Sequence, residues 1–185
     1  RYMIESVPEK CKACRRCEIA CIAAHHGLTF KEALKKRDEL VARVHVVKSG
    51  SVKSPISCRP CENAPCARIC PTGALQQDDG IVTMNAQICS GCQLCIMACP
   101  YGVRDWNKAS KTVEKCTLCE QKLSQGELPQ CVAQCGARAR FFGDLDQGVD
   151  NFEGPAHPDS PGCQYEEMTQ TRVKLKDYVE PYTAN

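Results

Sequence analysis

Apolar residues in this chain of 185 residues occur in short runs, and none of the runs is long enough to form a membrane-spanning helix. Three runs are rich in β-branched or aromatic residues and predict strands at Tyr2–Ile4, Ile81–Met84 and Phe141–Phe142. The Asp79-Gly80 pair directly before Ile81 predicts the tight turn of a hairpin. Short helices are expected from Ile19 to Ala24 and from Ile96 to Ala98. Such a mixture of short elements predicts a small α+β fold.

Residues 22–57 contain a clearer helical pattern. Thr29 and Glu32 have the spacing of a capping box, and the apolar residues after them recur at helical intervals. The pattern predicts a helix from about Phe30 to Ala42, followed by a strand from Arg43 to Lys48. The basic residues on the other helix face are interpreted as a solvated surface, and the alternative is a docking surface for an acidic partner.

The composition changes after Leu145. Glycine and proline are frequent in residues 146–163, which predicts a loop. Val173, Leu175 and Val179 then alternate with polar residues and indicate a possible short strand. We expect residues 147–185 to form an extended C-terminal arm. The arm either drapes over a partner subunit, which we favour, or ends as a loose tail.

Cysteine is the most unusual component of the chain, with 17 residues against an aromatic content of only 5%. The hydrophobic fraction of 43% includes these cysteines, so little conventional apolar material remains for a core. No secretory signal is visible, so we expect a cytoplasmic protein, in which disulfides are rare. The cysteines are therefore interpreted as metal ligands. A formal charge of +2 with few, scattered aromatics argues against a nucleic-acid-binding protein.

Sixteen of the cysteines fall into four groups of four, and Cys163 stands alone. The first and third groups have the spacing C-x2-C-x2-C-x3-C, the second has C-x2-C-x4-C-x3-C, and the fourth has a longer central gap. Pro71 and Pro100 follow the last cysteines of the second and third groups. In chain order the groups are Cys11, Cys14, Cys17 and Cys21; Cys58, Cys61, Cys66 and Cys70; Cys89, Cys92, Cys95 and Cys99; and Cys116, Cys119, Cys131 and Cys135.

Three cysteines within seven residues form a tight loop of thiolates that wraps three corners of an iron–sulfur cube. In two-cluster ferredoxins the fourth cysteine of such a run ligates the other cluster of the pair. Soft thiolates select iron–sulfur clusters or zinc. Structural zinc usually takes two separated C-x2-4-C pairs, which the first and third groups fit poorly, and a zinc-binding interaction module is kept as an alternative. Because cysteine supplies every ligand, the expected task is electron conduction rather than catalysis.

With these spacings, the two Cys-Pro steps and the Phe141–Leu145 segment, residues 7–146 resemble the four-cluster iron–sulfur subunits of molybdenum and tungsten oxidoreductases. Similar subunits accompany carbon monoxide dehydrogenases and aldehyde oxidoreductases. The resemblance implies four 4Fe–4S clusters, with ligands crossed between the first and fourth groups and between the second and third. The implied ligands are Cys11, Cys14, Cys17 and Cys135 for set 1; Cys58, Cys61, Cys66 and Cys99 for set 2; Cys89, Cys92, Cys95 and Cys70 for set 3; and Cys116, Cys119, Cys131 and Cys21 for set 4.

Crossed ligation implies one ferredoxin-like unit nested inside another. The outer unit uses residues 1–51 and 108–146, with a helical insertion at 22–57, and the inner unit uses residues 52–107. The resemblance also implies a non-catalytic electron-transfer subunit of a larger, anaerobic redox complex. Its partners would be a catalytic subunit, first of all a molybdopterin or tungstopterin enzyme, and a flavin subunit or further copies of itself. The alternative is a freestanding ferredoxin-type carrier.

Polar residues near the predicted ligands have two interpretations each. Several basic residues either offset the negative charge of the clusters or are simply solvated: Lys12, Arg15, Arg16, Arg59, Arg68, Arg104, Lys115 and Arg138. His25 and His26 are interpreted as a polar helix end, and the alternative is that they act on the cluster of set 4.

Overall fold

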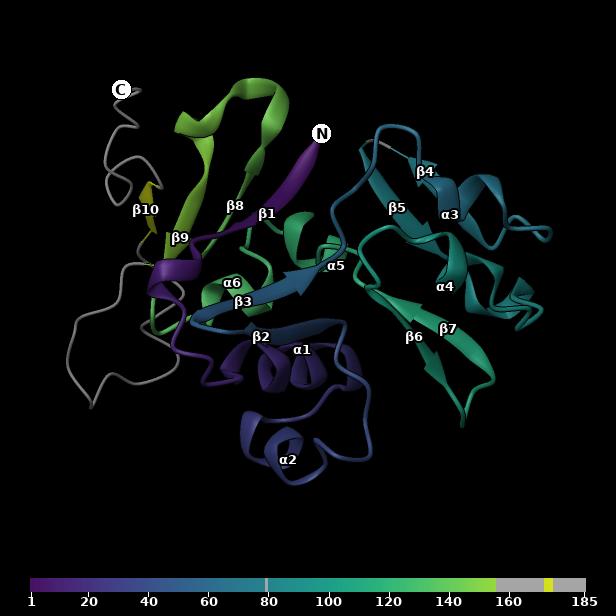
Figure 1. The fold of residues 1–185 in the computed structure, drawn as a ribbon, viewed down its shortest axis with the longest axis horizontal. Helices are drawn as coiled ribbons and strands as arrows, with labels where there is room; N and C mark the ends of the chain where they lie inside the picture. Colours follow the sequence, from purple (N-terminus) through teal and green to yellow (C-terminus); the bar gives the residue numbers. More distant parts are fainter. Residues whose placement is uncertain (79, 156–171, 175–185) are drawn as a thin grey trace.

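The computed structural model describes residues 1–78, 80–155 and 172–174 of the chain. Its largest sheet has the strand order β1-β8-β9-β10, with antiparallel neighbours. The strands are β1 (Tyr2–Ser6), β8 (Arg140–Asp144), β9 (Glu153–Pro155) and β10 (Arg172–Lys174). β1 and β8 pair along their whole length, which confirms the first and last predicted strands. Figure 1 shows this purple and green pair, which brings together two segments far apart in the sequence.

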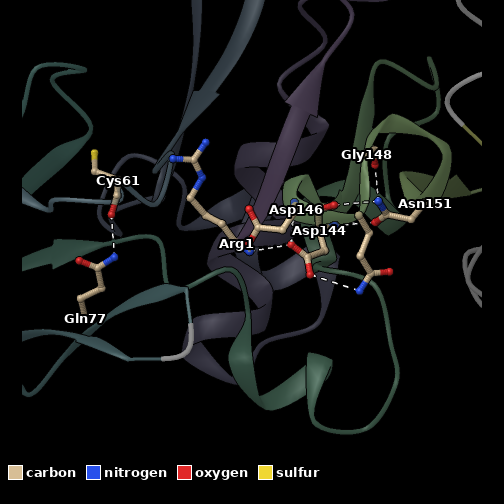
Figure 2. Close-up of polar contacts among 8 residues, drawn as sticks. Arg1, Cys61, Gln77, Asp144, Asp146, Gly148 and Asn151 are labelled. Carbon is tan, nitrogen blue, oxygen red and sulfur yellow. Dashed lines mark hydrogen bonds and ion pairs between the residues drawn. The ribbon is translucent and has the colours of Figure 1, made fainter.

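The segment from Leu145 to Pro155 folds back onto this sheet, so the loop prediction for residues 146–163 is wrong for its described part. The 3-10 helices η3 (Leu145–Gln147) and η4 (Val149–Asn151) lead into β9. The physical reason is Phe152, which is 1% exposed and packs with Phe141. The Asn151 side chain stabilises the turn through two hydrogen bonds with the backbone of Asp144 (Figure 2). The Asp144 N–H donates to Asn151 Oδ1 at 2.6 Å, and Asn151 Nδ2 donates to the Asp144 carbonyl oxygen at 2.7 Å. Cys163 and most of the predicted arm lie outside the described residues.

Three two-stranded hairpins form the other sheets of the described residues. They pair β2 (Val44–Ser49) with β3 (Val52–Ser57), β4 (Leu75–Asp78) with β5 (Ile81–Met84), and β6 (Arg104–Asn107) with β7 (Thr112–Lys115). Asp78 lies opposite Ile81, so the predicted hairpin and its second strand are confirmed. The boundaries predicted at 51/52 and 107/108 both fall at the turn of a hairpin, so two hairpins connect the predicted units.

Helix α1 (Arg16–His26) extends the predicted helix in both directions, and α2 (Phe30–Lys35) begins where the capping box predicts. The Glu32 N–H donates to Thr29 Oγ1 at 3.3 Å, and the Thr29 N–H donates to the Glu32 carboxylate at 2.8 Å. α2 ends earlier than predicted, because the chain turns to pack Leu40 and Ala42 with Ala33 against α1. The strand predicted after it is confirmed as β2. β3 was not predicted because it contains Pro55, which only a strand with a free edge tolerates.

Short helices follow the later cysteine loops. They are α3 (Pro65–Arg68), α4 (Leu94–Ala98), α5 (Glu120–Leu123) and α6 (Gln130–Ala133), with the 3-10 helices η1 (Pro8–Lys10) and η2 (Ala86–Ile88) before the first and third groups. α4 confirms the helix predicted at Ile96–Ala98. In Figure 1 the teal segments from α3 to β7 lie on one side, and α1, α2 and the β1–β8 sheet lie on the other. No helix among the described residues is long and apolar enough to span a membrane.

Candidate metal centre

The C-x2-C segments of the first, third and fourth groups share a backbone feature. The residue before the second cysteine has a positive φ in each, 52° at Ala13, 70° at Gly91 and 57° at Leu118. This conformation costs an L-residue about 1–2 kcal/mol, and such strain gathers at functional sites. The turns direct backbone N–H groups at sulfur: Ala13 donates to Cys11 Sγ and Leu118 to Cys116 Sγ, both at 3.4 Å. Amide groups arranged in this way favour anionic thiolates.

Cys21, the last cysteine of the first group, lies among cysteines of the fourth group. It is buried on α1, in the helical turn that follows Cys17. Burial raises the pKa of Cys21 well above its usual value, and the charges of Cys131, Cys116 and Cys119 raise it further. Interactions of this kind require the sulfur atoms to be close in space. Helix α1 therefore brings the two groups together.

Cys135, the last cysteine of the fourth group, lies beside the first group. Burial raises the pKa of Cys135, backbone hydrogen bonds oppose the rise, and the charge of Cys14 adds to it. Burial also raises the pKa of Cys17 to about 12, and Cys131 and Cys135 contribute to this rise. The contact has a simple structural origin, because α6 ends just before Cys135 and packs against α1.

The second and third groups approach each other in the same crossed manner. Burial raises the pKa of Cys61, and the charges of Cys66 and Cys99 raise it further. Burial likewise raises the pKa of Cys95, with added contributions from Cys66 and Cys70. Helix α3, which contains Cys66, packs against α4, which contains Cys95. Figure 2 shows that the Gln77 side chain donates to the Cys61 carbonyl oxygen at 2.8 Å, which ties the second group to β4.

Each fourth cysteine thus lies near at least one other member of its predicted set, although the complete ligand sets stay predictions. Cys11, Cys89 and Cys92 are assigned to their sets from the sequence, by the loops that carry them. Four thiolates per set is the donor set that a 4Fe–4S cube takes. In the described part of the chain, no three cysteine, histidine or carboxylate side chains converge as they would around a single metal ion.

Three further proximities link cysteines of different predicted sets. Cys66 of set 2 interacts with Cys95 of set 3. Cys58 of set 2 interacts with Cys116 of set 4, and Cys131 of set 4 interacts with Cys17 of set 1. These contacts connect the predicted sets in the order 3, 2, 4, 1, which we call the row. Among the described cysteines only Cys92 and Cys14 are exposed, one in each of the two end sets, whereas all four cysteines of set 4 are buried.

His25 touches a predicted ligand, which the interpretation as a polar helix end did not anticipate. Its Nε2 lies 3.9 Å from Cys119 Sγ, and its Nδ1 lies 3.2 Å from Arg43 Nη1. Burial, assisted by the Arg43 charge, lowers the pKa of His25 to about 4, so the imidazole is neutral at neutral pH. The signal in the sequence was its position four residues after Cys21, which places both residues on the same face of α1.

Comparison with known proteins agrees with this donor chemistry. Residues 51–145 match the family model described as a 4Fe-4S dicluster domain. The chain belongs to this family. In this 4Fe–4S dicluster protein the match spans the second, third and fourth cysteine groups, and the first group precedes it.

Several relatives cover most of the chain. It is 39% identical over 157 residues to an iron-sulfur protein of Rhodospirillum rubrum, with 78% of this chain and 83% of the relative covered. It is 37% identical over 158 residues to protein NrfC of Escherichia coli strain K12, covering 79% of this chain and 66% of NrfC. It is 34% identical over 162 residues to the electron transport protein HydN of the same strain, with 80% of this chain and 90% of HydN covered.

Proposed function

We propose that this 4Fe–4S dicluster protein is an electron-transfer subunit that carries four 4Fe–4S clusters on the four predicted cysteine sets. The observation that carries the proposal is the crossing, in which the last cysteine of every group lies near cysteines of another group. Two-cluster ferredoxins use this arrangement to hold a pair of clusters. Two crossed pairs of groups therefore fit four clusters.

The first cysteine group supports four clusters rather than the two of a dicluster domain. It lies outside the matched residues, yet it has the same spacing as the third group. The two loops also share backbone conformation at corresponding residues, with positive φ at Ala13 and Arg15 in one and at Gly91 and Gln93 in the other. A loop of the same length and shape fits the same kind of cluster.

The arrangement of the sets favours a relay between two partners. A 4Fe–4S cube, when bound, takes up and releases one electron. In this row all four cysteines of the predicted set 4 are buried, and one cysteine of each end set, Cys92 or Cys14, is exposed. A row with two accessible ends suits a protein that receives electrons at one surface and delivers them at another. The relative HydN is named an electron transport protein.

The proposed partner at one end is the catalytic subunit of a redox enzyme, with a molybdenum or tungsten pterin enzyme as the first choice from the family resemblance. A flavin subunit or another copy of the chain would serve at the other end. A cytoplasmic location stays a prediction from the sequence. Anaerobic purification from the native source, followed by identification of the proteins that co-purify, tests the partner.

Two nested ferredoxin-like units are the architecture that we propose for this function. The pairing of β1 with β8 supports it, because this pairing returns the chain to its starting point after the middle segment. The crossing of the first group with the fourth, around the second and third, supports it as well.

Iron content and electron paramagnetic resonance (EPR) test the number of clusters. An anaerobically prepared chain is expected to hold about sixteen iron atoms and to give EPR signals of reduced clusters on addition of dithionite. A colourless protein, or one with far fewer irons, would refute the proposal and favour a zinc-binding module.

The crossing itself is tested by comparing which EPR signal each variant loses. Cys99→Ala and Cys58→Ala are expected to lose the same signal, because both residues belong to set 2. Cys99→Ala and Cys89→Ala are expected to lose different signals, although Cys99 and Cys89 belong to the same group in the sequence. Loss of one common signal from Cys99→Ala and Cys89→Ala, with the Cys58→Ala signal separate, would disprove the crossing.

A further inference from the structure

Three charged side chains are buried in the described part of the molecule, and all three are cations. Arg104 is 6% exposed, Lys115 is 1% exposed and Arg140 is 0% exposed. Burying a charge without a partner is costly, and proteins normally pair buried charges or neutralise them. The identity of the anions that balance these three cations is therefore a structural question.

No carboxylate among the described residues pairs with these cations. Arg104 donates from Nη2 to Cys66 Sγ, and Arg140 donates from Nη2 to Ser57 Oγ at 2.7 Å. The Nε and Nη1 atoms of both arginines have no hydrogen-bond partner. Lys115 Nζ donates only to backbone carbonyl oxygens, one of them that of Cys116 at 2.6 Å.

Arg104 and Lys115 also lie directly opposite each other on the β6–β7 hairpin. Like charges at opposed positions of a strand pair destabilise the sheet. Two buried cations at such a pair need negative charge close by. The thiolates of the cysteine sets are the available anions, since Cys58, Cys66 and Cys116 all interact with Lys115.

Each cation faces cysteines of two neighbouring sets, and the three cations occupy the three junctions of the row. Arg104 donates to Cys66 of set 2, and it interacts with Cys58 and Cys61 of the same set and with Cys95 of set 3. Lys115 interacts with Cys58 and Cys66 of set 2 and Cys116 of set 4. Arg140 begins β8, which packs against α6, the helix that contains Cys131, and it interacts with Cys131 and Cys116 of set 4 and with Cys17 and Cys135 of set 1.

We propose that Arg104, Lys115 and Arg140 are charge-compensating residues, each of which raises the reduction potential of the two clusters that flank its junction. The inference rests on the proposed function, because it assigns the clusters to the four sets. Reduction adds negative charge to a set of thiolates that is already anionic. A cation buried beside it stabilises the reduced form more than the oxidised form, and weak screening in the interior makes the effect large.

The location of the cations predicts a pattern that does not depend on assigning the signals. Arg104→Gln, Lys115→Gln and Arg140→Gln are each prepared anaerobically and titrated with EPR detection. Each variant is expected to lower two of the four midpoint potentials by about 59 mV or more, a tenfold change in a one-electron equilibrium constant. Arg104→Gln and Lys115→Gln should share one shifted signal, and so should Lys115→Gln and Arg140→Gln. Arg104→Gln and Arg140→Gln should share none.

Arg59→Gln is the matched control, because Arg59 follows Cys58 directly but is 45% exposed and pairs with Glu5. Its loss should leave all four potentials unchanged. Arg104→Lys, Lys115→Arg and Arg140→Lys retain the positive charge and should keep the wild-type potentials. If a glutamine variant fails to bind iron, the charge-conserving variant at the same position decides: normal iron content and potentials support the role of charge, and failure to bind iron refutes it.

The outcomes separate this inference from the proposed function. A wild-type chain with far fewer than about sixteen irons overturns the proposed function, and this inference with it. Normal iron content with unchanged potentials in all three glutamine variants overturns the inference alone. A shift of all four potentials in every variant also overturns it, because the effect would then be global rather than confined to one junction.

Discussion

The part of the molecule built from residues 1–57 and 116–155, here called the sheet part, contains more of the apolar clusters than residues 58–115, here called the middle part. The first part has one cluster around Ile19, Ile22 and Ala33, a second around Phe141 and Phe152, and most of the largest core cluster. In the middle part, the described residues contribute a small cluster of Ala64, Leu75, Val82 and Val113 around Cys66 and Cys95. Two cysteine sets are predicted in each part, whereas the apolar clusters are divided unequally between the two parts.

The unequal division of the apolar clusters indicates how a chain with few aromatic residues can remain folded. A small unit buries too little surface to be stable alone, and metal ligation replaces the missing core. The middle part should therefore depend on its clusters for structure, whereas the sheet part retains some stability from side-chain packing.

Removal of the clusters should cause the largest loss of structure, and it should affect the middle part more than the sheet part. After anaerobic oxidation and chelation, the amides of β4 to β7 are expected to exchange at rates close to those of an unfolded chain. The amides of β1 and β8 should keep part of their protection. Hydrogen exchange followed by mass spectrometry measures both regions in one sample. Equal loss in both regions would show that the apolar clusters of the sheet part contribute little.

Phe152→Ala should destabilise the sheet part without removing iron. Truncation of a fully buried phenylalanine costs about 3–5 kcal/mol of unfolding free energy, and Phe152 lies in a cluster that contains no predicted ligand. Leu75→Ala, which costs about 2–5 kcal/mol, lies beside Cys66 and Cys95 and should lower the iron content as well. Anaerobic thermal denaturation and iron analysis of the two variants provide the comparison. Loss of iron from Phe152→Ala would contradict the separation of the two parts.

Gly91→Ala should destabilise the third cysteine loop locally. Gly91 has a φ of +70°, and an added Cβ would lie 2.9 Å from the Lys111 carbonyl oxygen and 3.0 Å from the Trp106 ring. Gly102 is the matched control, because its φ is +61° and an added Cβ meets nothing within 4 Å. The extra crowding should cost Gly91→Ala about 1–3 kcal/mol more than Gly102→Ala. Denaturation midpoints under a chelator measure the difference, and equal midpoints would exclude the close contact.

The His45–Asp105 pair, which joins β2 to β6, should make the smallest contribution to the free energy of unfolding, and this contribution should depend on pH. His45 Nε2 lies 2.7 Å from Asp105 Oδ2, and this hydrogen bond raises the pKa of His45 above its usual value. A raised folded-state pKa stabilises the protein fully below the unfolded value of about 6.5, and the contribution disappears as pH rises through the folded value. His45→Gln should therefore cost a few tenths to about 1 kcal/mol at pH 5.5, since the pair is partly exposed, and nearly nothing at pH 9. A cost that grows with pH would reverse the sign and reject this explanation.

Local patterns predicted several of the short elements correctly. The capping box located the start of α2, and the Asp79-Gly80 step located the β4–β5 hairpin. The end of α2 and the fold of residues 145–155 were missed, because each depends on an apolar contact with a distant segment. Leu40 turns toward α1, and Phe152 packs on Phe141.

The candidate site likewise contains residues that the sequence identified and residues that only the structure revealed. Spacing identified all sixteen predicted ligands, and the basic residues singled out near them included Arg104 and Lys115. Arg140 was not among them, because only the pairing of β8 with β1 and its hydrogen bond to Ser57 at the end of β3 make it a buried residue. The contact between His25 and Cys119 depends likewise on how α1 packs against the fourth group.

The sequence alone determined the chemistry, because the ligand type and the shape of a C-x2-C loop are properties of a few consecutive residues. Only the tertiary structure decided which cysteines of distant groups lie near one another and that Arg104, Lys115 and Arg140 are buried beside them. Those properties arise from the packing of helices and the pairing of strands that lie more than a hundred residues apart, as β1 and β8 do. No local spacing specifies such contacts, because they form only where the whole chain buries its apolar and thiolate-bearing surfaces together.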